Sequence, residues 1–190
     1  MWKIKIELGF EKNNYYCSDV FFLENRAGTT EFLCITFRMF GDDEAVLISN
    51  RINGEQTKDI ICEIRVSATE ICLDLYGTVE IIQHSCRVWT TLYIECNSDD
   101  TTTYCKYDVN GTTGSFTRSQ NDFYEGQFWL GSRNDNTMFF NGQVAAVEVY
   151  QAKSSSEIPE SLKKLVIKNQ RVDQYDKQSY PWMDNEHFYL

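Results

Sequence analysis

Apolar and polar residues alternate with a period of two along most of this sequence, and this pattern constrains the fold more than any other feature. Successive side chains of a strand point to opposite faces, so such alternation places one face of each strand in a core. Helical periodicity is almost absent before residue 154. The pattern predicts strands at Trp2–Leu8, Val20–Leu23, Phe32–Phe40, Ala45–Asn50, Ile60–Val66, Glu70–Tyr76, Val79–Gln83, Arg87–Glu95, Thr103–Val109, Gly114–Arg118, Gln127–Gly131 and Gln143–Tyr150.

Clusters of Gly, Asn, Asp and Ser separate these segments at intervals of about ten residues, the spacing of a sandwich or barrel. Asn53-Gly54 and Asn110-Gly111 are dipeptides that tolerate positive φ and close tight hairpins between antiparallel strands. After Tyr150 the pattern changes to serines, acids and a proline, followed by leucines at helical spacing. This change predicts one short helix of two to three turns that begins at Ser154.

The length and the tail of the chain predict one domain with an extension. A single core of this size buries roughly 70% of the surface of the unfolded chain, and no linker interrupts residues 1–170. Residues 171–190 mix aromatic and charged side chains without a clear period. We expect this tail to pack on the domain or on a partner, and the tail or the edge strands offer a route to self-assembly.

The composition excludes several classes of protein. Apolar residues make up 42% of the chain and aromatic residues 14%, which is too much burial for a disordered chain. No stretch approaches the roughly 20 apolar residues that cross a bilayer, so membrane insertion is not expected. The net charge of -10 disfavours nucleic acid, because binding a polyanion requires a basic surface.

Seven cysteines exceed ordinary usage, but their number is odd and no CxxC spacing indicates a zinc site. Cys96 and Cys105 straddle one expected hairpin, and Cys62 and Cys72 straddle another near Ser67. Each pair can therefore face across two antiparallel strands, within reach of a disulfide. Buried free thiols are the alternative, since cysteine is among the residues that are most often buried.

The cysteines and the first ten residues give opposite indications of the cellular compartment. Disulfides would place the protein in an extracellular or cell-surface environment, which we favour. Residues 1–10 alternate and carry charges, so they indicate a first strand and not a signal peptide. The protein is intracellular if Met1 is its native start, and otherwise a leader has been removed.

The second half of the chain carries a family resemblance. Residues 88–111, VWTTLYIECNSDDTTTYCKYDVNG, place a tryptophan-led strand before a hairpin that ends in Asn-Gly, and residues 128–150 read FWLGSRNDNTMFFNGQVAAVEVY. These patterns resemble the laminin-G-like and concanavalin-A-like domains of the lectin and glucanase superfamily. The resemblance implies an all-β fold, a two-sheet antiparallel jelly-roll sandwich with one short C-terminal helix. It covers roughly residues 79–168.

Several residues of these motifs have a physical role in such a sandwich. We expect Asn110-Gly111 to close a hairpin and Gly131 to let the chain leave its strand. Phe140 should anchor the following loop in the core, and Gly142 should turn the chain into the last strand.

The resemblance also covers enzymes, because some glycoside hydrolases of this fold place several carboxylates on one strand. Glu70 and Asp74 share a face of one expected strand, but a third acid is missing. His84 and Cys86 are neighbours without an acid to orient the histidine, so a nucleophilic pair is disfavoured. We therefore expect no catalytic residues and no enzyme activity.

Members of this family often bind calcium on the rim of the sandwich, which the resemblance places at Asp59 and at Asn121 or Asp122. Oxygen ligands suit calcium, but the ion takes six to eight of them, so backbone carbonyls and water would have to complete the set. Ser132 stands where the family has a second glycine, which weakens the match. Ordinary polar loops are the alternative interpretation, and no other cofactor is indicated.

Polar loops are also the candidates for glycan binding, because amides and acids bind sugar hydroxyls while aromatic rings stack on sugar faces. The candidate rim residues are Asp42, Asp43, Asn134, Asp135 and Asn136. The same residue types are expected in turns that bind nothing. Asn110 begins the one glycosylation sequon, although a hairpin turn already accounts for it.

These observations favour a non-catalytic binding or assembly module that recognises a protein or a glycan, or that is a subunit of an extracellular or surface structure. The first alternative is an intracellular or viral building block that assembles with itself. A glycan-processing enzyme with divergent carboxylates is the least favoured of the three.

Overall fold

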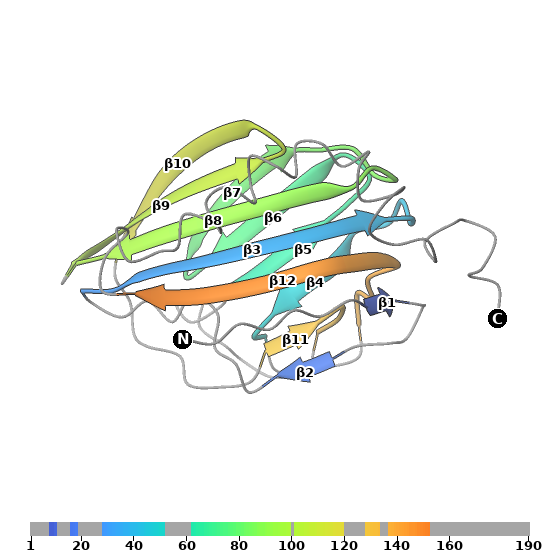
Figure 1. The fold of residues 1–190 in the computed structure, drawn as a ribbon, viewed down its shortest axis with the longest axis horizontal. Coiled ribbons are helices and arrows are strands. Elements are labelled where there is room, and N and C mark those ends of the chain that lie inside the picture. Colours follow the sequence, from blue (N-terminus) through green and yellow to red (C-terminus); the bar gives the residue numbers. More distant parts are fainter. Residues whose placement is uncertain are drawn as a thin grey trace.

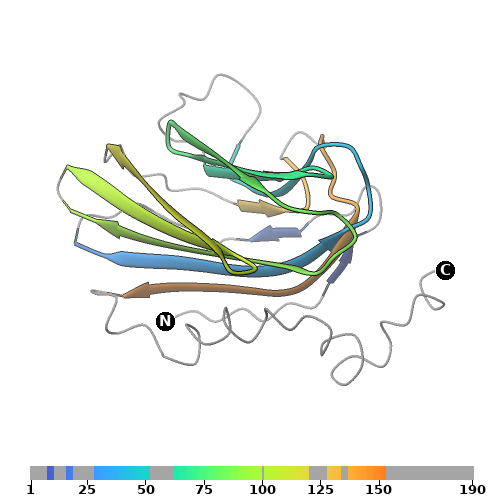
Figure 2. The ribbon, with the colours of Figure 1, turned by 90° about the horizontal axis from the view of Figure 1, so that it is seen from above.

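The computed structural model has two six-stranded antiparallel sheets that pack face to face as a sandwich (Figure 1; Figure 2). The structure describes residues 8–10, 16–18, 28–51, 62–99, 101–119, 128–133 and 137–152. All regular secondary structure within these residues is β-strand, so the prediction of an all-β jelly-roll sandwich is confirmed. None of the described residues forms a helix that could cross a membrane.

Each sheet contains strands from both halves of the chain. The first sheet, in spatial order, contains β1 (Leu8–Phe10), β12 (Gly142–Ala152), β3 (Thr30–Met39), β8 (Thr90–Ser98), β9 (Thr102–Val109) and β10 (Thr112–Ser119). The second contains β2 (Tyr16–Ser18), β11 (Phe128–Leu130), β4 (Ala45–Ser49), β5 (Cys62–Val66), β6 (Glu70–Leu75) and β7 (Thr78–Gln83). Long-range pairs such as β12 with β3 therefore join the two ends of the chain.

The core lies between the sheets and is built from alternate residues of the strands, as the period of two requires. Leu33, Ile35 and Phe37 of β3 face Ile64 of β5 and Leu73 of β6, and each is at most 1% exposed. Full burial of one such side chain contributes about 1.5–3 kcal/mol relative to exposure. The inward face of each sheet is thereby fixed, which leaves the opposite faces for other roles.

The hairpin between β9 and β10 turns at Asn110-Gly111, as predicted. The two residues have φ values of 50° and 92°, the left-handed conformation that a tight hairpin turn requires. The Asn110 amide donates to the carbonyl of Trp89 over 3.2 Å, and its Oδ1 accepts from the Thr91 N–H over 2.8 Å. The side chain of the predicted glycosylation site is thus bonded to main chain, and its glycosylation stays a prediction.

The motif after β11 also has the predicted roles. Gly131 leaves the strand with a φ of 88°. Phe140 is fully buried, and its ring meets that of Phe37 edge-on with centroids 6.1 Å apart. A Cβ atom on Gly142 would lie 2.2 Å from the Arg38 carbonyl oxygen, so only glycine allows β12 to pair this closely with β3.

One predicted strand is displaced in the structure. β8 begins at Thr90 and not at Arg87, because Arg87 adopts a φ of 63° in the preceding turn and Val88 is exposed. The other predicted strands within the described residues agree to about two residues at each end.

Several predictions fall where the structure is not described. Trp2–Leu8 meets the described residues only at Leu8, where β1 begins, and Val20–Leu23 lies outside them. The short helix from Ser154 and the boundary between residues 1–170 and 171–190 also lie outside and stay predictions.

Candidate functional site

The outward face of the second sheet carries a regular grid of side chains. The strand register aligns one row across β11, β4, β5, β6 and β7 from Trp129, Ser49, Glu63, Asp74 and Val79, and a second row from Val46, Arg65, Cys72 and Ile81. The middle of the face is therefore charged, and the side near β7 is apolar. Trp129, Ser49, Glu63, Val46 and Cys72 are buried, so the accessible part of this face is the side that carries Val79 and Ile81.

Glu63 is the centre of this face and is completely buried. Arg133, which follows β11, donates from Nε to Oε2 over 2.8 Å and from Nη2 to Oε1 over 2.6 Å. Ser49 Oγ donates to Oε2 over 2.8 Å. Arg51 and Arg65 flank the same carboxylate, and we refer to Glu63 with its three arginines as the arginine cluster.

The carboxylate of Glu63 stays ionised because of these partners. Burial alone raises its pKa, but hydrogen bonds from Arg133 and Ser49 and the charges of Arg133 and Arg51 outweigh that effect. The pKa of Glu63 is consequently below its ordinary value. A bidentate arginine–carboxylate pair is geometrically specific, so Glu63 fixes the orientation of Arg133.

Arg65 and Arg51 differ in the hydrogen bonds that their side chains make. Arg65 donates from Nη1 to Glu44 Oε1 over 2.9 Å and from Nη2 to Cys72 Sγ over 3.1 Å. Arg51 lies 3.7 Å from Glu63 Oε2, and its Nη2 lies 3.9 Å from Asp74 Oδ2; neither contact is a hydrogen bond.

Arg51 is the member of the arginine cluster that is best placed to meet a ligand. Its side chain is 35% exposed, and no side-chain hydrogen bond ties it to another described residue. A guanidinium group can donate two parallel hydrogen bonds to a carboxylate. Val79 and Ile81, at 55% and 47% exposure, supply apolar surface on the same face.

Of the predicted rim residues, the structure describes Asp42 and Asp43, and neither is part of the arginine cluster. Asp42 and Asp43 are exposed between β3 and β4. Asp42 Oδ1 lies 3.8 Å from Arg87 Nη2 and 3.9 Å from Cys86 Sγ, both in the connection between β7 and β8. The remaining rim candidates, residues 134–136, lie outside the described residues, so a glycan site on these loops stays a prediction.

The predicted calcium ligands Asp59, Asn121 and Asp122 also lie outside the described residues. Within the described part of the chain, no three acidic, histidine or cysteine side chains form a group that could hold a metal ion. Arg118, near the end of β10, is buried and stacks on the Tyr76 ring at 4.3 Å. Calcium binding therefore stays a prediction.

Glu70 and Asp74 do not form a glycosidase pair. Both belong to the outward face of β6, as the alternation predicts. Four residues of strand separate them by about 13 Å. Retaining and inverting glycosidases place their carboxyl groups roughly 5–9.5 Å apart. Asp74 instead lies beside Arg51.

The contacts of His84 indicate a structural role. Its Nε2 lies 2.9 Å from the Ser67 carbonyl oxygen, its Nδ1 lies 3.3 Å from Thr90 Oγ1, and its ring packs against Phe37. Burial lowers the pKa of His84 despite the hydrogen bond to Ser67. Both ring nitrogens are occupied, so the histidine does not activate Cys86.

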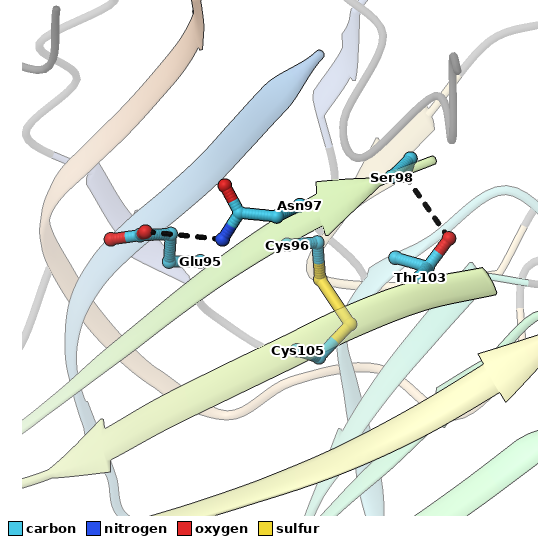
Figure 3. Close-up of a disulfide and its surroundings, with 6 residues drawn as sticks. All are labelled: Glu95, Cys96, Asn97, Ser98, Thr103 and Cys105. Carbon is cyan, nitrogen blue, oxygen red and sulfur yellow. Dashed lines mark hydrogen bonds between the residues drawn. A yellow bond between two sulfur atoms is a disulfide. The ribbon is translucent and has the colours of Figure 1, made fainter. Parts of the chain in front are cut away.

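The structure joins Cys96 to Cys105, which face each other across β8 and β9 with Cα atoms 4.2 Å apart. Figure 3 shows this disulfide beside the hydroxyls of Ser98 and Thr103, which form the next pair on the same face of the hairpin and lie 3.0 Å apart. The sequence predicts this pairing, because the two cysteines straddle the expected hairpin.

The predicted pairing of Cys62 with Cys72 is wrong. Cys62 lies opposite Leu75, and Cys72 lies opposite Arg65. The hairpin is centred beyond Ser67, and its register puts Cys62 in the core and Cys72 on the outward face. A shift in register moves a side chain to the other face of a sheet, which excludes the disulfide.

The members of the arginine cluster were not predicted from the sequence. The only signal is a glutamate between apolar residues in CEIRV, where the alternation gives it an outward position and no reason for burial. Arg51 and Arg133 follow different strands and are far apart in the sequence. Their meeting at Glu63 depends on the pairing of β11 with β4, which no local pattern specifies.

Comparison with solved structures identifies the fold. The chain matches CBM40 of the Ruminococcus gnavus IT-sialidase, solved bound to alpha2,3 sialyllactose, at 16% identity over 81% of this chain and 93% of that chain, with a TM-score of 0.52. It matches mouse laminin alpha1 domains LG4-5 at 12% identity over 79% and 42% of the two chains, with a TM-score of 0.53. The fold is thus that of the concanavalin-A-like jelly rolls, which confirms the resemblance.

A third match is the binding domain of botulinum neurotoxin serotype D, at 9% identity over 87% of this chain and 42% of that chain, with a TM-score of 0.56. The chain therefore spans less than half of the laminin and neurotoxin chains that it matches. No protein-family model matches the sequence, and no curated protein matches it either. At these identities the likeness concerns the fold alone.

Proposed function

We propose that this concanavalin-A-like jelly roll is a non-catalytic binding module, and that its ligand is a glycan with an acidic group. The observation that carries the proposal is the position of Arg51, which is one-third exposed beside a buried carboxylate and makes no side-chain hydrogen bond within the described residues. Glu63 and Arg133 supply a rigid support next to it. A carboxylate of the glycan would accept hydrogen bonds from the guanidinium of Arg51.

The neighbouring side chains fit the rest of a sugar. Asp74, beside Arg51, would accept hydrogen bonds from hydroxyl groups, and Val79 and Ile81 would contact the apolar face of the ring. Sialylated sugars combine a carboxylate with hydroxyls, and one solved structure with this fold is bound to a sialyllactose. That likeness supports a glycan as the ligand class without specifying which glycan.

Titration calorimetry with sialyllactose and with neutral lactose, each in calcium and in EDTA, tests the proposal. We expect the acidic sugar to bind and Arg51→Gln to weaken it by at least about tenfold, because a charge-assisted hydrogen bond contributes about 1.5–3 kcal/mol. Arg87→Gln is the matched control, since Arg87 is exposed on another part of the molecule. Equal binding of both sugars, or an unchanged affinity in Arg51→Gln, would reject the site.

We also propose a second candidate function, association through the edge strand β7. This strand pairs only with β6 among the described strands, and its outward residues Val79 and Ile81 are about half exposed. An unprotected edge with apolar side chains is a template for another strand. Sedimentation velocity at increasing concentration tests it, and a strictly monomeric chain would reject it.

We place the protein in an extracellular or cell-surface environment. The disulfide between Cys96 and Cys105 supports this proposal, because disulfides persist in oxidising compartments. Mass spectrometry of the protein from its native source, after blocking of free thiols, would show the Cys96–Cys105 linkage; two free thiols there would contradict the assignment.

A further inference from the structure

The end of the sandwich at which β3 leads into β4 carries apolar and acidic side chains that are both exposed. Phe40, in the connection from β3 to β4, and Val88, in the connection from β7 to β8, are 39% and 52% exposed. Figure 1 shows both connections at the end of β3. Asp42 and Asp43 follow Phe40 and are also exposed. We refer to Phe40, Asp42, Asp43 and Val88 as the acidic tip.

Neighbouring residues hold the acidic tip in one conformation. The guanidinium of Arg38 lies over the Phe40 ring at 5.3 Å and over the Trp89 ring at 4.9 Å. The Arg87 N–H donates to the carbonyl of Met39 over 2.7 Å, which places the two connections side by side. A preorganised surface loses little conformational entropy when it binds a partner. The tip is therefore suited to contact another surface without rearrangement.

The outward face of the second sheet has the complementary chemistry around Arg51. The Arg51 side chain is one-third exposed, and Val79 and Ile81 supply apolar surface on the same face. Five large apolar side chains are exposed within the described residues, and four of them belong either to the acidic tip or to this face. One surface thus combines carboxylates with apolar groups, and the other combines a guanidinium with apolar groups. Surfaces that match in this way favour specific association.

The two surfaces also match in scale. Arg51 Nη2 lies 3.9 Å from Asp74 Oδ2, and Asp74 is directly opposite Val79 on the next strand, about 4.8 Å away. In the acidic tip, Phe40 and Asp43 are three residues apart, so their Cα atoms are separated by at most about 11 Å. On each surface the charged group and the apolar groups are therefore close enough to contact one small area of a partner.

The acidic tip cannot reach Arg51 of its own chain. The five residues of β4 separate Asp43 from Arg51 and span roughly 17 Å, which is longer than an aspartate and an arginine side chain together. Glu44, the next acid, already accepts from Arg65 Nη1 over 2.9 Å. Asp43 makes no side-chain hydrogen bond or ion pair within the described residues. Its carboxylate is consequently available to a second copy of the chain.

We propose that the acidic tip of one copy docks on the Arg51 face of a second copy. Asp43 accepts hydrogen bonds from the Arg51 guanidinium, and the apolar side chains of the tip pack on those of the face. The contact joins two different surfaces, so copies associate head to tail and not as a symmetric pair. It is a small contact, so association requires a high protein concentration. The inference uses the arginine of the proposed glycan site but does not depend on glycan binding.

Two variants that each lose one surface provide the test. Arg51→Gln removes the charge of the face, and Asp42→Asn/Asp43→Asn removes the charge of the tip. Sedimentation velocity from about 10 μM to about 500 μM covers the range of weak contacts, at an ionic strength that screens long-range repulsion beyond about 8 Å. The unaltered chain should associate, and each variant alone should associate at least about tenfold more weakly. Lys106→Gln, exposed on the other sheet, is the control and should associate like the unaltered chain.

A mixture of the two variants distinguishes head-to-tail docking from other modes. The intact tip of Arg51→Gln fits the intact face of the tip variant, so the mixture should form dimers. These dimers should not grow, because neither an intact tip nor an intact face remains free. A monomeric unaltered chain, a tip variant that associates normally, or a mixture without dimers would each overturn the proposal. Normal association of the tip variant would instead indicate pairing through β7.

The outcome for the glycan site is read separately. The tip variant retains Arg51, so it should bind sialyllactose with the affinity of the unaltered chain. Failure of sialyllactose to bind, together with head-to-tail association, would reject the glycan and leave the docking intact. Binding of sialyllactose to a chain that stays monomeric would do the reverse.

Discussion

At the scale of single residues, the disulfide between Cys96 and Cys105 is a local restraint on the unfolded chain. It closes a loop between residues nine apart, which corresponds to about 2–3 kcal/mol of stability in the chain-entropy description. We expect Cys96→Ala/Cys105→Ala to lower the free energy of unfolding in urea by about this amount. Reduction should destabilise the unaltered protein to the same level and leave the double variant unchanged. An unaltered protein that is insensitive to reduction would show that the bond does not form.

Residues whose role is local could be predicted from the sequence, whereas residues whose role depends on distant partners could not. Asn110 and Gly111 adopt positive φ because of their own chemistry and the two strands beside them. Glu63 has no such local signature. Its burial depends on Arg133, which is 70 residues away in the sequence, and a buried carboxylate without that partner would be strongly unfavourable.

At the scale of strands, β7 combines an edge position with two half-exposed apolar side chains. Ile81→Lys should reduce association while changing the free energy of unfolding by less than about 0.5 kcal/mol, because the site is exposed. Sedimentation velocity measures the association. Tyr104→Lys adds the same charge at an exposed position of β9 and should leave it unchanged. Equal effects of both variants would indicate a nonspecific response to charge.

The strand pattern also shows where sequence information ends. Alternation locates most strands, because the inward positions must be apolar whichever strand lies alongside. It does not set the register. A hairpin centred at Ser67 pairs Cys62 with Cys72, whereas the observed hairpin is centred beyond Ser67. Nor does alternation indicate which outward positions are buried, since Phe32 looks like one more apolar residue in a run that is buried on both faces.

At the scale of the whole molecule, the lowered pKa values of His84 and Glu63 make stability depend on pH. Burial lowers the pKa of His84 below its ordinary 6.5, and the pKa of Glu63 is below its ordinary 4.5. The unfolded chain therefore binds more protons than the folded one, and stability falls on acidification. The contribution of His84 is lost first, as the pH falls from about 6.5 towards its lower folded pKa. That of Glu63 is lost below 4.5, as the pH falls through its folded pKa.

Urea unfolding between pH 7 and pH 3 measures both steps. We expect the free energy of unfolding to decline in the range below 6.5 in the unaltered protein and to be flat there in His84→Gln. Both proteins should decline again below 4.5. A decline of equal size in the upper range of His84→Gln would assign that step to another group.

The arginine cluster has a consequence for how quickly an anion could reach it. Its three arginines stand beside three carboxylates, those of Glu63, Asp74 and Glu44, while the chain as a whole carries a net charge of -10. The repulsion from this net charge is screened beyond about 8 Å; inside that distance an approaching anion meets repulsion, and only at contact does it meet a guanidinium. Electrostatic steering would therefore slow the encounter instead of guiding it. Added salt should therefore accelerate association. The dissociation rate of the ligand, and not its association rate, would determine which ligands stay bound to the sheet.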